Sequence, residues 1–186
     1  MKKTITLSFL SLRKITSIKH LSLIFFMIIF FICNLSATDN TYIMNNSSAL
    51  PSGWSKSSRT AFVTYASKTS LQLMGLSGGV EGEVFTTTTF SNVTAISFSG
   101  TGSNAIALNL YYSTDNSTWN AVTPSVNVAK NSTSYSTYTF SDLSVLSNKT
   151  VYLKFRTSAS SAYLYSITIT TSVVSPSIST PSPTSL

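Results

Sequence analysis

The sequence has very little of the material from which catalytic and metal sites are usually built. Among its 186 residues there is one cysteine, Cys33, one histidine, His20, and five acidic residues. Both Cys33 and His20 lie in an N-terminal segment with the features of an export signal. The exported chain would then have no disulfide, no thiolate nucleophile and no cysteine or histidine ligand for a metal. The remaining carboxylates, lysines and tyrosines form no catalytic arrangement, so we do not expect an enzyme.

The N-terminal residues have the pattern of a secretory signal peptide. Five lysine and arginine residues and no acid lie between residues 2 and 19, an apolar run follows at 21–33, and small residues lead up to Ala37. A membrane anchor is the alternative, but an anchor needs about 20 apolar residues. We therefore predict a helical signal peptide over residues 1–37, cleaved after Ala37. The protein would be secreted or exposed at the cell surface, with no membrane segment after cleavage.

The net charge of the whole chain is misleading about its partners. The formal charge is +7, but five of the 12 basic residues belong to the predicted leader. The rest of the chain has seven basic residues against five acids, and no basic stripe that could neutralise phosphates. The sequence therefore predicts no nucleic-acid partner.

Beyond the leader, apolar and small polar residues alternate with the period of two that half-buries a β-strand. The alternation is strongest at 104–113, 151–157 and 162–170, and in the last of these we expect Tyr163, Tyr165, Ile167 and Ile169 to share one face. Weaker alternation predicts further strands at 60–65, 70–74, 83–89, 93–99, 120–128 and 134–140. No segment after the leader has a sustained helical stripe.

These patterns predict an all-β protein, a jelly-roll β-sandwich of two antiparallel sheets over residues 38–172. After residue 172 the composition changes, because three prolines interrupt small polar residues and no core-forming pattern continues. We expect residues 173–186 to be a linker rich in Pro, Ser and Thr that leads to a further domain missing from this sequence.

Several short motifs occur in an order that is typical of one group of exported domains. They are LPSGW at 50–54, SKTSLQL at 67–73, LYYSTDNSTW at 110–119, VYLKFRTS at 151–158 and YLYSITIT at 163–170. In this order the chain resembles the N-terminal jelly-roll domains of secreted Bacteroidetes-type proteins, which are described as adhesin-like, choice-of-anchor or carbohydrate-binding-module-like. The resemblance implies a hairpin at 113–119 that ends at Trp119. The chain departs from this group at Tyr165 and Ser166, where many relatives have two consecutive acids.

The aromatic residues are the best candidates for ligand binding. Sugar rings have apolar faces that stack on flat side chains, while tyrosine and tryptophan also offer a polar group. We predict Tyr111, Tyr138, Tyr152 and Trp54 as ligand-binding residues, because the tyrosines lie on polar strand faces or their edges. Tryptophans such as Trp54 and Trp119 are more often core residues or pack within a hairpin.

The few acids allow a calcium site but do not require one. Glu81 and Glu83 are two residues apart and would share a strand face, while Asp115 and Asp142 lie in turn-like sequence. Carboxylate oxygens are calcium ligands, so these four residues are candidate metal ligands and calcium is the possible cofactor. The alternative is that the glutamates are solvated and that the aspartates support turns through hydrogen bonds to nearby backbone N–H groups. We favour the turn for Asp115.

Together these features predict a non-catalytic binding module for a carbohydrate, such as a polysaccharide or surface glycan, or for another surface ligand. The alternative is a structural spacer or targeting domain that belongs to a larger exported protein and has no ligand of its own.

Overall fold

The structure is a computed structural model that describes residues 37–46, 48–157 and 159–172. The predicted signal peptide before Ala37 and the predicted linker at 173–186 lie outside the described residues. Within the described ranges the only helical element is a single 3₁₀ turn, η1 (Ser144–Leu146). No helix in this part of the chain is long and apolar enough to cross a membrane.

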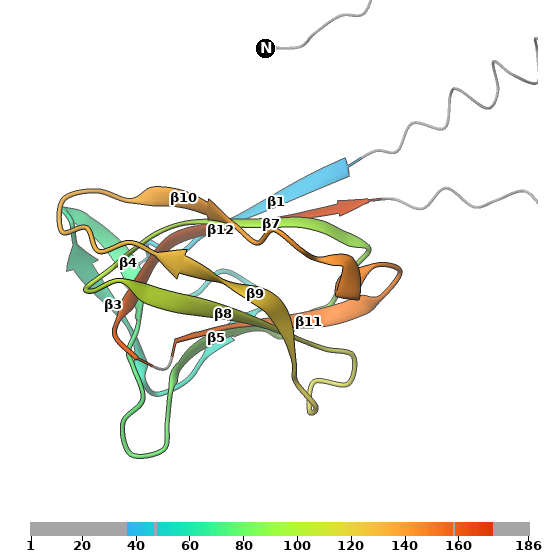
Figure 1. The fold of residues 1–186 in the computed structure, drawn as a ribbon, viewed down its shortest axis with the longest axis horizontal. Coiled ribbons are helices and arrows are strands. Elements are labelled where there is room, and N and C mark those ends of the chain that lie inside the picture. The colour runs from blue at the N-terminus through green and yellow to red at the C-terminus, as the bar shows by residue number, and fades with distance from the viewer. Residues whose placement is uncertain (1–36, 47, 158, 173–186) are drawn as a thin grey trace, which may run out of the picture. The chain divides into compact units, whose positions relative to one another are not determined.

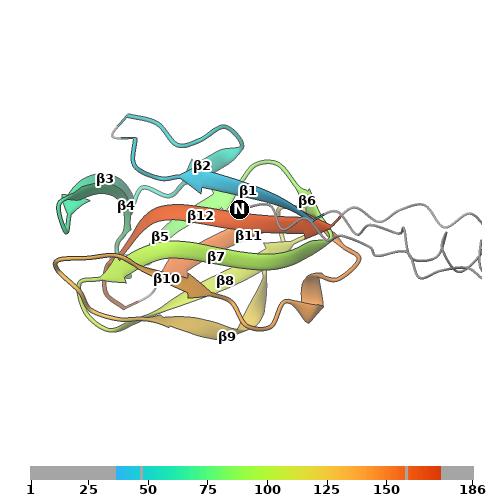
Figure 2. The same ribbon diagram turned by 90° about the horizontal axis from the view of Figure 1, so that it is seen from above.

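The strands form two layers, which we call sheet I and sheet II (Figure 1). In sheet I the central strand is β12 (Ala162–Ser172), and Figure 2 shows neighbouring strands on either side of it. The order across sheet I is β10 (Ser136–Thr139), β7 (Val93–Gly102), β12, β4 (Lys68–Leu73) and β3 (Thr60–Tyr65), with β1 (Ala37–Ile43) paired to the second half of β12.

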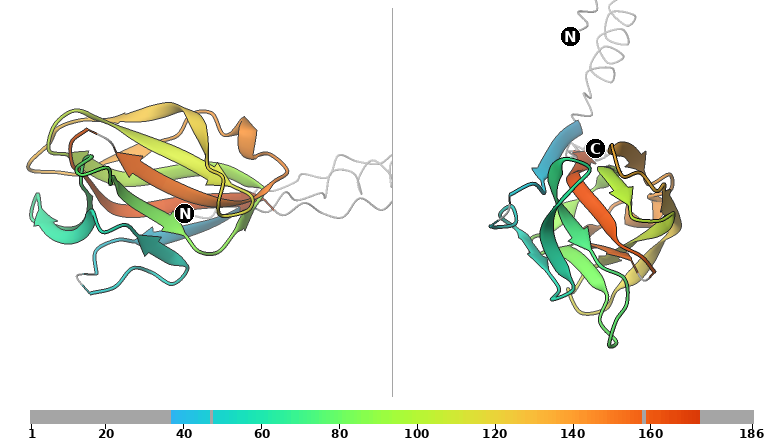
Figure 3. Two further views of the ribbon diagram at one scale, coloured as in Figure 1. Left: turned by 90° about the horizontal axis from the view of Figure 1, so that it is seen from below. Right: turned by 90° about the vertical axis from the view of Figure 1, so that its left-hand side faces the viewer.

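In sheet II the central strand is β11 (Thr150–Thr157), and β8 lies between it and β9 in the left view of Figure 3. The order across sheet II is β2 (Trp54–Lys56), β5 (Gly82–Thr86), β11, β8 (Ile106–Ser113) and β9 (Asn120–Val128), with β6 (Phe90–Ser91) paired to one end of β11. The strand pairs within both sheets are antiparallel. The predicted all-β sandwich of two antiparallel sheets is therefore confirmed.

The core lies between the two sheets and is built by alternate residues of each strand. On β11 the residues Val151, Leu153 and Phe155 have no exposed surface, whereas the intervening residues are half-buried. Strand β8 contributes Leu108 and Leu110 in the same way. Each such side chain stabilises the fold by about 1.5–3 kcal/mol relative to its exposed state, so the period of two in the sequence is the main determinant of the sandwich.

Strand β12 departs from the alternation that its sequence predicts. A register shift between Leu164 and Ser166 adds one residue relative to β7, which is a β-bulge. Leu164, Ile167 and Ile169 are consequently buried in the core, whereas Tyr163 and Tyr165 are directed to the other face, where they contact tyrosines from other segments. The prediction that these two tyrosines share a face with the isoleucines is wrong, because a bulge reverses the alternation of every residue after it.

Candidate functional site

The outer face of sheet II brings together aromatic and charged side chains from three strands. On β11 the residues that alternate with the core are Tyr152, Lys154 and Arg156, and all are half-buried. Lys154 lies between Phe85 on β5 and Tyr111 on β8, because it is the cross-strand partner of both. Phe85 and Tyr111 are therefore two strand spacings apart, about 10 Å.

A tryptophan from the hairpin between β8 and β9 completes this surface. Trp119 lies just before β9, and the Lys154 Nζ atom is 4.2 Å from the centroid of its ring. The Arg156 guanidinium is 4.3 Å from the centroid of the Tyr111 ring and also donates a hydrogen bond to the Tyr111 hydroxyl. The two cations hold both rings by cation–π attraction. We call the four rings on this face, from Phe85, Tyr111, Trp119 and Tyr152, the aromatic platform.

Glu81 and Glu83 lie on the same face, as their spacing predicts, but both are engaged by basic side chains. Arg156 Nε is 2.8 Å from a Glu81 oxygen and Arg156 Nη1 is 3.7 Å from Glu83, while Lys154 Nζ is 3.6 Å from the other Glu83 oxygen. The two acids thus balance the charges of the two cations. Their role in this arrangement is to position Lys154 and Arg156 against the aromatic platform.

Asp115 ties together the turn in which it lies. Its Oδ1 atom accepts hydrogen bonds from the backbone N–H groups of Ser117 and Thr118, each at 2.8 Å, and from the Ser113 hydroxyl. Asn116, between Asp115 and Ser117, has a backbone φ of 59°, which asparagine tolerates better than most residues. The turn interpretation of Asp115 is therefore confirmed. The same backbone hydrogen bonds hold the pKa of the Asp115 carboxyl well below its usual value of 3.8.

The lowered pKa predicts how the stability of the protein depends on pH. Because the folded state holds the ionised form of Asp115, its contribution is present above pH 3.8 and is lost as the pH falls through the lowered pKa. Asp115→Asn keeps the oxygen acceptor and removes the charge. We expect this variant to be less stable than the wild type at pH 7 in urea unfolding, and the difference to shrink as the pH falls below 3.8. A difference that is the same at every pH would contradict the prediction.

The four candidate calcium ligands are not brought together. Asp142 lies before η1, where its Oδ1 atom accepts a hydrogen bond from the Ser144 N–H at 2.9 Å, and this bond lowers the pKa of its carboxyl. Asp115 is in its own turn and the two glutamates are paired with bases. Across the described ranges no group of three or more acidic, histidine or cysteine side chains is positioned to hold a metal ion.

Of the predicted ligand-binding residues, Tyr111 and Tyr152 lie on the aromatic platform, whereas Tyr138 does not. Its ring stacks on Phe98 with centroids 5.2 Å apart, and its hydroxyl accepts a hydrogen bond from the Ala129 N–H. Tyr138 thus packs against the core from the edge strand β10. Its place there follows from the pairing of Tyr138 with Phe98 across β10 and β7, which the sequence of β10 alone does not reveal.

Trp54 also lies away from the platform. Only 8 % of its surface is exposed. Its ring packs edge-on to that of Tyr42, with centroids 5.1 Å apart, and against that of Phe155, with centroids 6.1 Å apart. The expectation that Trp54 offers a surface for stacking is therefore corrected, because its ring is enclosed between β1 and β11. The ring that does lie on the surface is Trp119. Lys154 and Arg156 were also not predicted as residues of the site, although they share a strand face with Tyr152.

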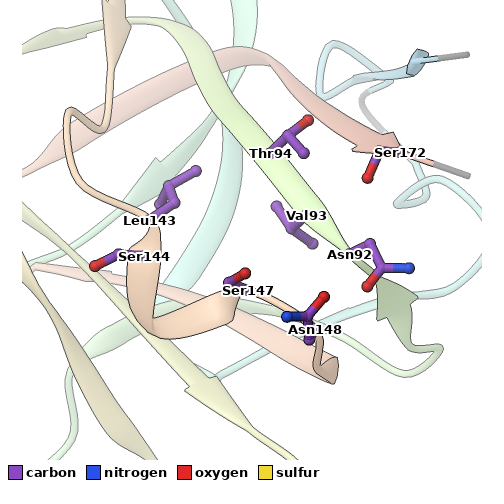
Figure 4. A pocket seen from close by; sticks show the side chains of 8 residues that line it. All are labelled: Asn92, Val93, Thr94, Leu143, Ser144, Ser147, Asn148 and Ser172. Carbon is purple, nitrogen blue, oxygen red and sulfur yellow. The ribbon is translucent and has the colours of Figure 1, made fainter. Parts of the chain in front are cut away.

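A hollow in the described part of the chain lies elsewhere. It has a volume of about 290 Å³ and is found where β7 begins, beside η1 and the end of β12 (Figure 4). Its lining consists of small, uncharged side chains: Asn92, Val93, Thr94, Leu143, Ser144, Ser147, Asn148 and Ser172. It has neither an aromatic ring nor a charged group, so the outer face of sheet II is the better candidate for a functional site.

No protein-family model matches the chain, and no curated protein matches it. Its fold is nevertheless similar to solved structures of family 29 carbohydrate-binding modules. The module CBM29_1 from Piromyces equi is 13% identical, with a TM-score of 0.53 over 74% of this chain and 92% of that one. A variant of CBM29-2 complexed with cellulohexaose is 14% identical, with a TM-score of 0.53 over 74% and 94% of the two chains. Another, complexed with mannohexaose, is 13% identical, with a TM-score of 0.51 over 74% and 94%.

At these identities the likeness concerns the fold. The chain has a β-sandwich similar to that of these modules. The jelly-roll architecture expected from the sequence agrees with that of these structures.

Proposed function

We propose that this protein is a non-catalytic carbohydrate-binding module, and that the aromatic platform on sheet II is its binding surface. The observation that carries the proposal is the clustering of Tyr111, Trp119, Tyr152 and Phe85 on one outer face, with polar groups between them. Flat rings stack on the apolar faces of sugars, and hydroxyl, amide and charged groups meet the sugar hydroxyls. The spacing of about 10 Å between Phe85 and Tyr111 is comparable to the length of a disaccharide.

The charges on this face favour an uncharged polysaccharide. Lys154 and Arg156 are balanced by Glu81 and Glu83, so the surface offers no excess of either sign to an ionic ligand. The pairing also argues against glycoside hydrolysis, which needs one protonated carboxylic acid and one carboxylate free to act at the sugar. In the solved structures of similar fold the bound molecules are cellulohexaose and mannohexaose, which contain no charged groups.

We further propose that the module acts outside the cell, in the adhesin-like manner that the sequence motifs suggest. The basic and apolar leader supports export. An exported binding domain with several aromatic contacts of modest strength would hold a protein or a cell to an insoluble or surface-bound glycan.

Affinity electrophoresis in gels that contain soluble β-glucans or mannans tests the proposed function. We expect the wild-type protein to be retarded by at least one of these polysaccharides. Replacing Tyr111 and Tyr152 together with alanine should abolish the retardation, because it removes two of the four rings from the platform.

Val145→Ala is the matched control, since Val145 is exposed on η1 and belongs to neither sheet. If the doubly substituted protein is still retarded, the binding surface lies elsewhere on the molecule. A lack of retardation by every polysaccharide in the panel would favour the alternative of a spacer domain without a ligand.

A further inference from the structure

The outer face of sheet I carries a second group of large aromatic side chains. We call Tyr65, Tyr135, Tyr163 and Tyr165 the tyrosine cluster. Tyr65 ends β3, Tyr135 lies just before β10, and the other two are on β12. The bulge in β12 is what directs Tyr163 and Tyr165 to this face while the isoleucines that follow reach the core. The cluster is therefore on the opposite sheet from the aromatic platform.

The large rings are confined to one end of the face. Further along the same face, β7 and β12 present small hydroxyl side chains such as Ser97, Ser99 and Thr168, which alternate with buried residues. The strands of sheet I that carry the cluster, β3 and β12, are visible in Figure 2. A sheet that needed only a solvated outer surface would have no use for four tyrosines at one end, where three of them, Tyr65, Tyr135 and Tyr165, are only half-buried.

The rings of the cluster are fixed in place by one another and by hydrogen bonds. Tyr65 and Tyr163 are parallel, with centroids 3.8 Å apart and an interplanar angle of 3°. Tyr163 is only 7 % exposed, whereas Tyr65, which stacks on it, is half-buried. The Tyr135 hydroxyl donates to Ser70 Oγ or to the Tyr65 carbonyl oxygen, at 2.8 and 3.0 Å. A ligand would meet rings that have already lost their conformational freedom, which lowers the entropic cost of binding.

The polar groups around the cluster match the chemistry of the aromatic platform. The Lys68 Nζ atom is 4.7 Å from the centroid of the Tyr165 ring, as Lys154 is over Trp119. Gln72 Nε2 is 3.4 Å from the Tyr163 hydroxyl, and Asn45 Nδ2 is 3.5 Å from the Tyr165 hydroxyl. Amides and phenol hydroxyls at the margins of flat rings are the groups that hydrogen-bond to sugar hydroxyls. Lys68 is the single charged group among them, and its ammonium lies over the rings of Tyr165 and Tyr135.

We propose that the tyrosine cluster is a second binding site for a neutral glycan, so that one domain holds two glycan chains on opposite faces. The choice of ligand class rests on the function proposed for the aromatic platform, but the site itself is built from different residues on a different sheet. Two weak sites on one rigid domain would cross-link soluble polysaccharide and would raise the avidity for an insoluble one.

Calorimetric titration with cellohexaose and mannohexaose tests this proposal in three proteins. They are the wild type, a platform variant (Tyr111→Ala with Trp119→Ala) and a cluster variant (Tyr65→Ala with Tyr165→Ala). We expect two sites in the wild type and one in each variant. Tryptophan emission separates the sites, because Trp119 is on the platform and the cluster contains no tryptophan. Binding to the cluster variant, which keeps Trp119, should therefore change the emission, whereas the platform variant should still release heat.

The outcomes distinguish the two proposals. If the wild type shows a single site and the platform variant loses it, the second site is overturned and the proposed function stands. One site that is lost only in the cluster variant would overturn the role of the platform and retain the cluster. Heat from neither sugar in the wild type would overturn both for this ligand class. If the cluster variant does not fold, Tyr165→Ser replaces it, and an unchanged two-site titration of that variant would overturn the second site.

Discussion

Replacing Trp119 with alanine is expected to weaken the binding of a soluble glycan by about thirtyfold, with a change in the free energy of unfolding of less than about 1 kcal/mol. The ring is half-buried on the outer face of sheet II, and the Lys154 ammonium occupies one of its two faces. In the proposed function the other face of the ring contacts the sugar. Loss of a central aromatic contact costs about 2 kcal/mol or more, whereas loss of a surface side chain changes stability little.

Calorimetric titration with the glycan that retards the wild type, together with urea unfolding, measures both quantities. Trp119→Phe is the matched control, because it keeps a flat ring over Lys154 and should retain part of the affinity. If Trp119→Ala bound the glycan as tightly as the wild type does, the aromatic platform would not be the binding surface. If it unfolded the protein, Trp119 would have to be regarded as a structural residue of the hairpin.

Replacing Trp54 with alanine is expected to have the reverse effect, a loss of about 3–5 kcal/mol of stability with unchanged affinity in the molecules that remain folded. Trp54 is 8 % exposed and fills the space between Tyr42 and Phe155. Truncation removes its transfer free energy and leaves a cavity that the rigid strands on either side cannot close. For a domain of this size the melting temperature should fall by about 10–20 °C.

Thermal unfolding followed by circular dichroism measures this change, with Trp54→Phe as the control that fills most of the same space and should cost much less. Binding of the folded variant is measured well below its melting temperature. A Trp54→Ala protein that melts like the wild type but no longer binds glycan would contradict the assignment of Trp54 to the core, and would restore its role as a ligand-binding residue.

The contrast between the two tryptophans shows where prediction from the sequence ends. The period of two gives the strand faces wherever the strand is regular, and the bounds of β3 and β9 agree with those predicted. Strands β1, β2 and β6 were not predicted. Two of them have only two or three residues, and β1 is a polar edge strand that pairs on one side alone. The bulge in β12 was not predicted either, because the sequence of β12 alternates as it would in a regular strand.

The candidate site could be predicted only in part. Tyr111 and Tyr152 were found because each lies on the polar side of a regular strand, and the common face of Glu81 and Glu83 follows from their spacing. The ion pairs with Lys154 and Arg156 depend on the order of the strands in sheet II, which local patterns do not contain. Trp119 follows a turn, so the direction of its side chain depends on the path of the hairpin. The tyrosine cluster requires three distant segments and a bulge to meet.

The pairing of β1 with β12 places Thr38, the first residue after the predicted cleavage site, directly opposite Thr171, so the two ends of the sandwich domain lie side by side. A force that pulls on these two residues acts across the ladder, and it loads the hydrogen bonds one after another rather than all together. Under tension β1 would peel away from Thr38 toward Ile43 before β7, β11 or β8 felt the load. A domain anchored in this way would lengthen at low force while the rest of both sheets stayed largely assembled.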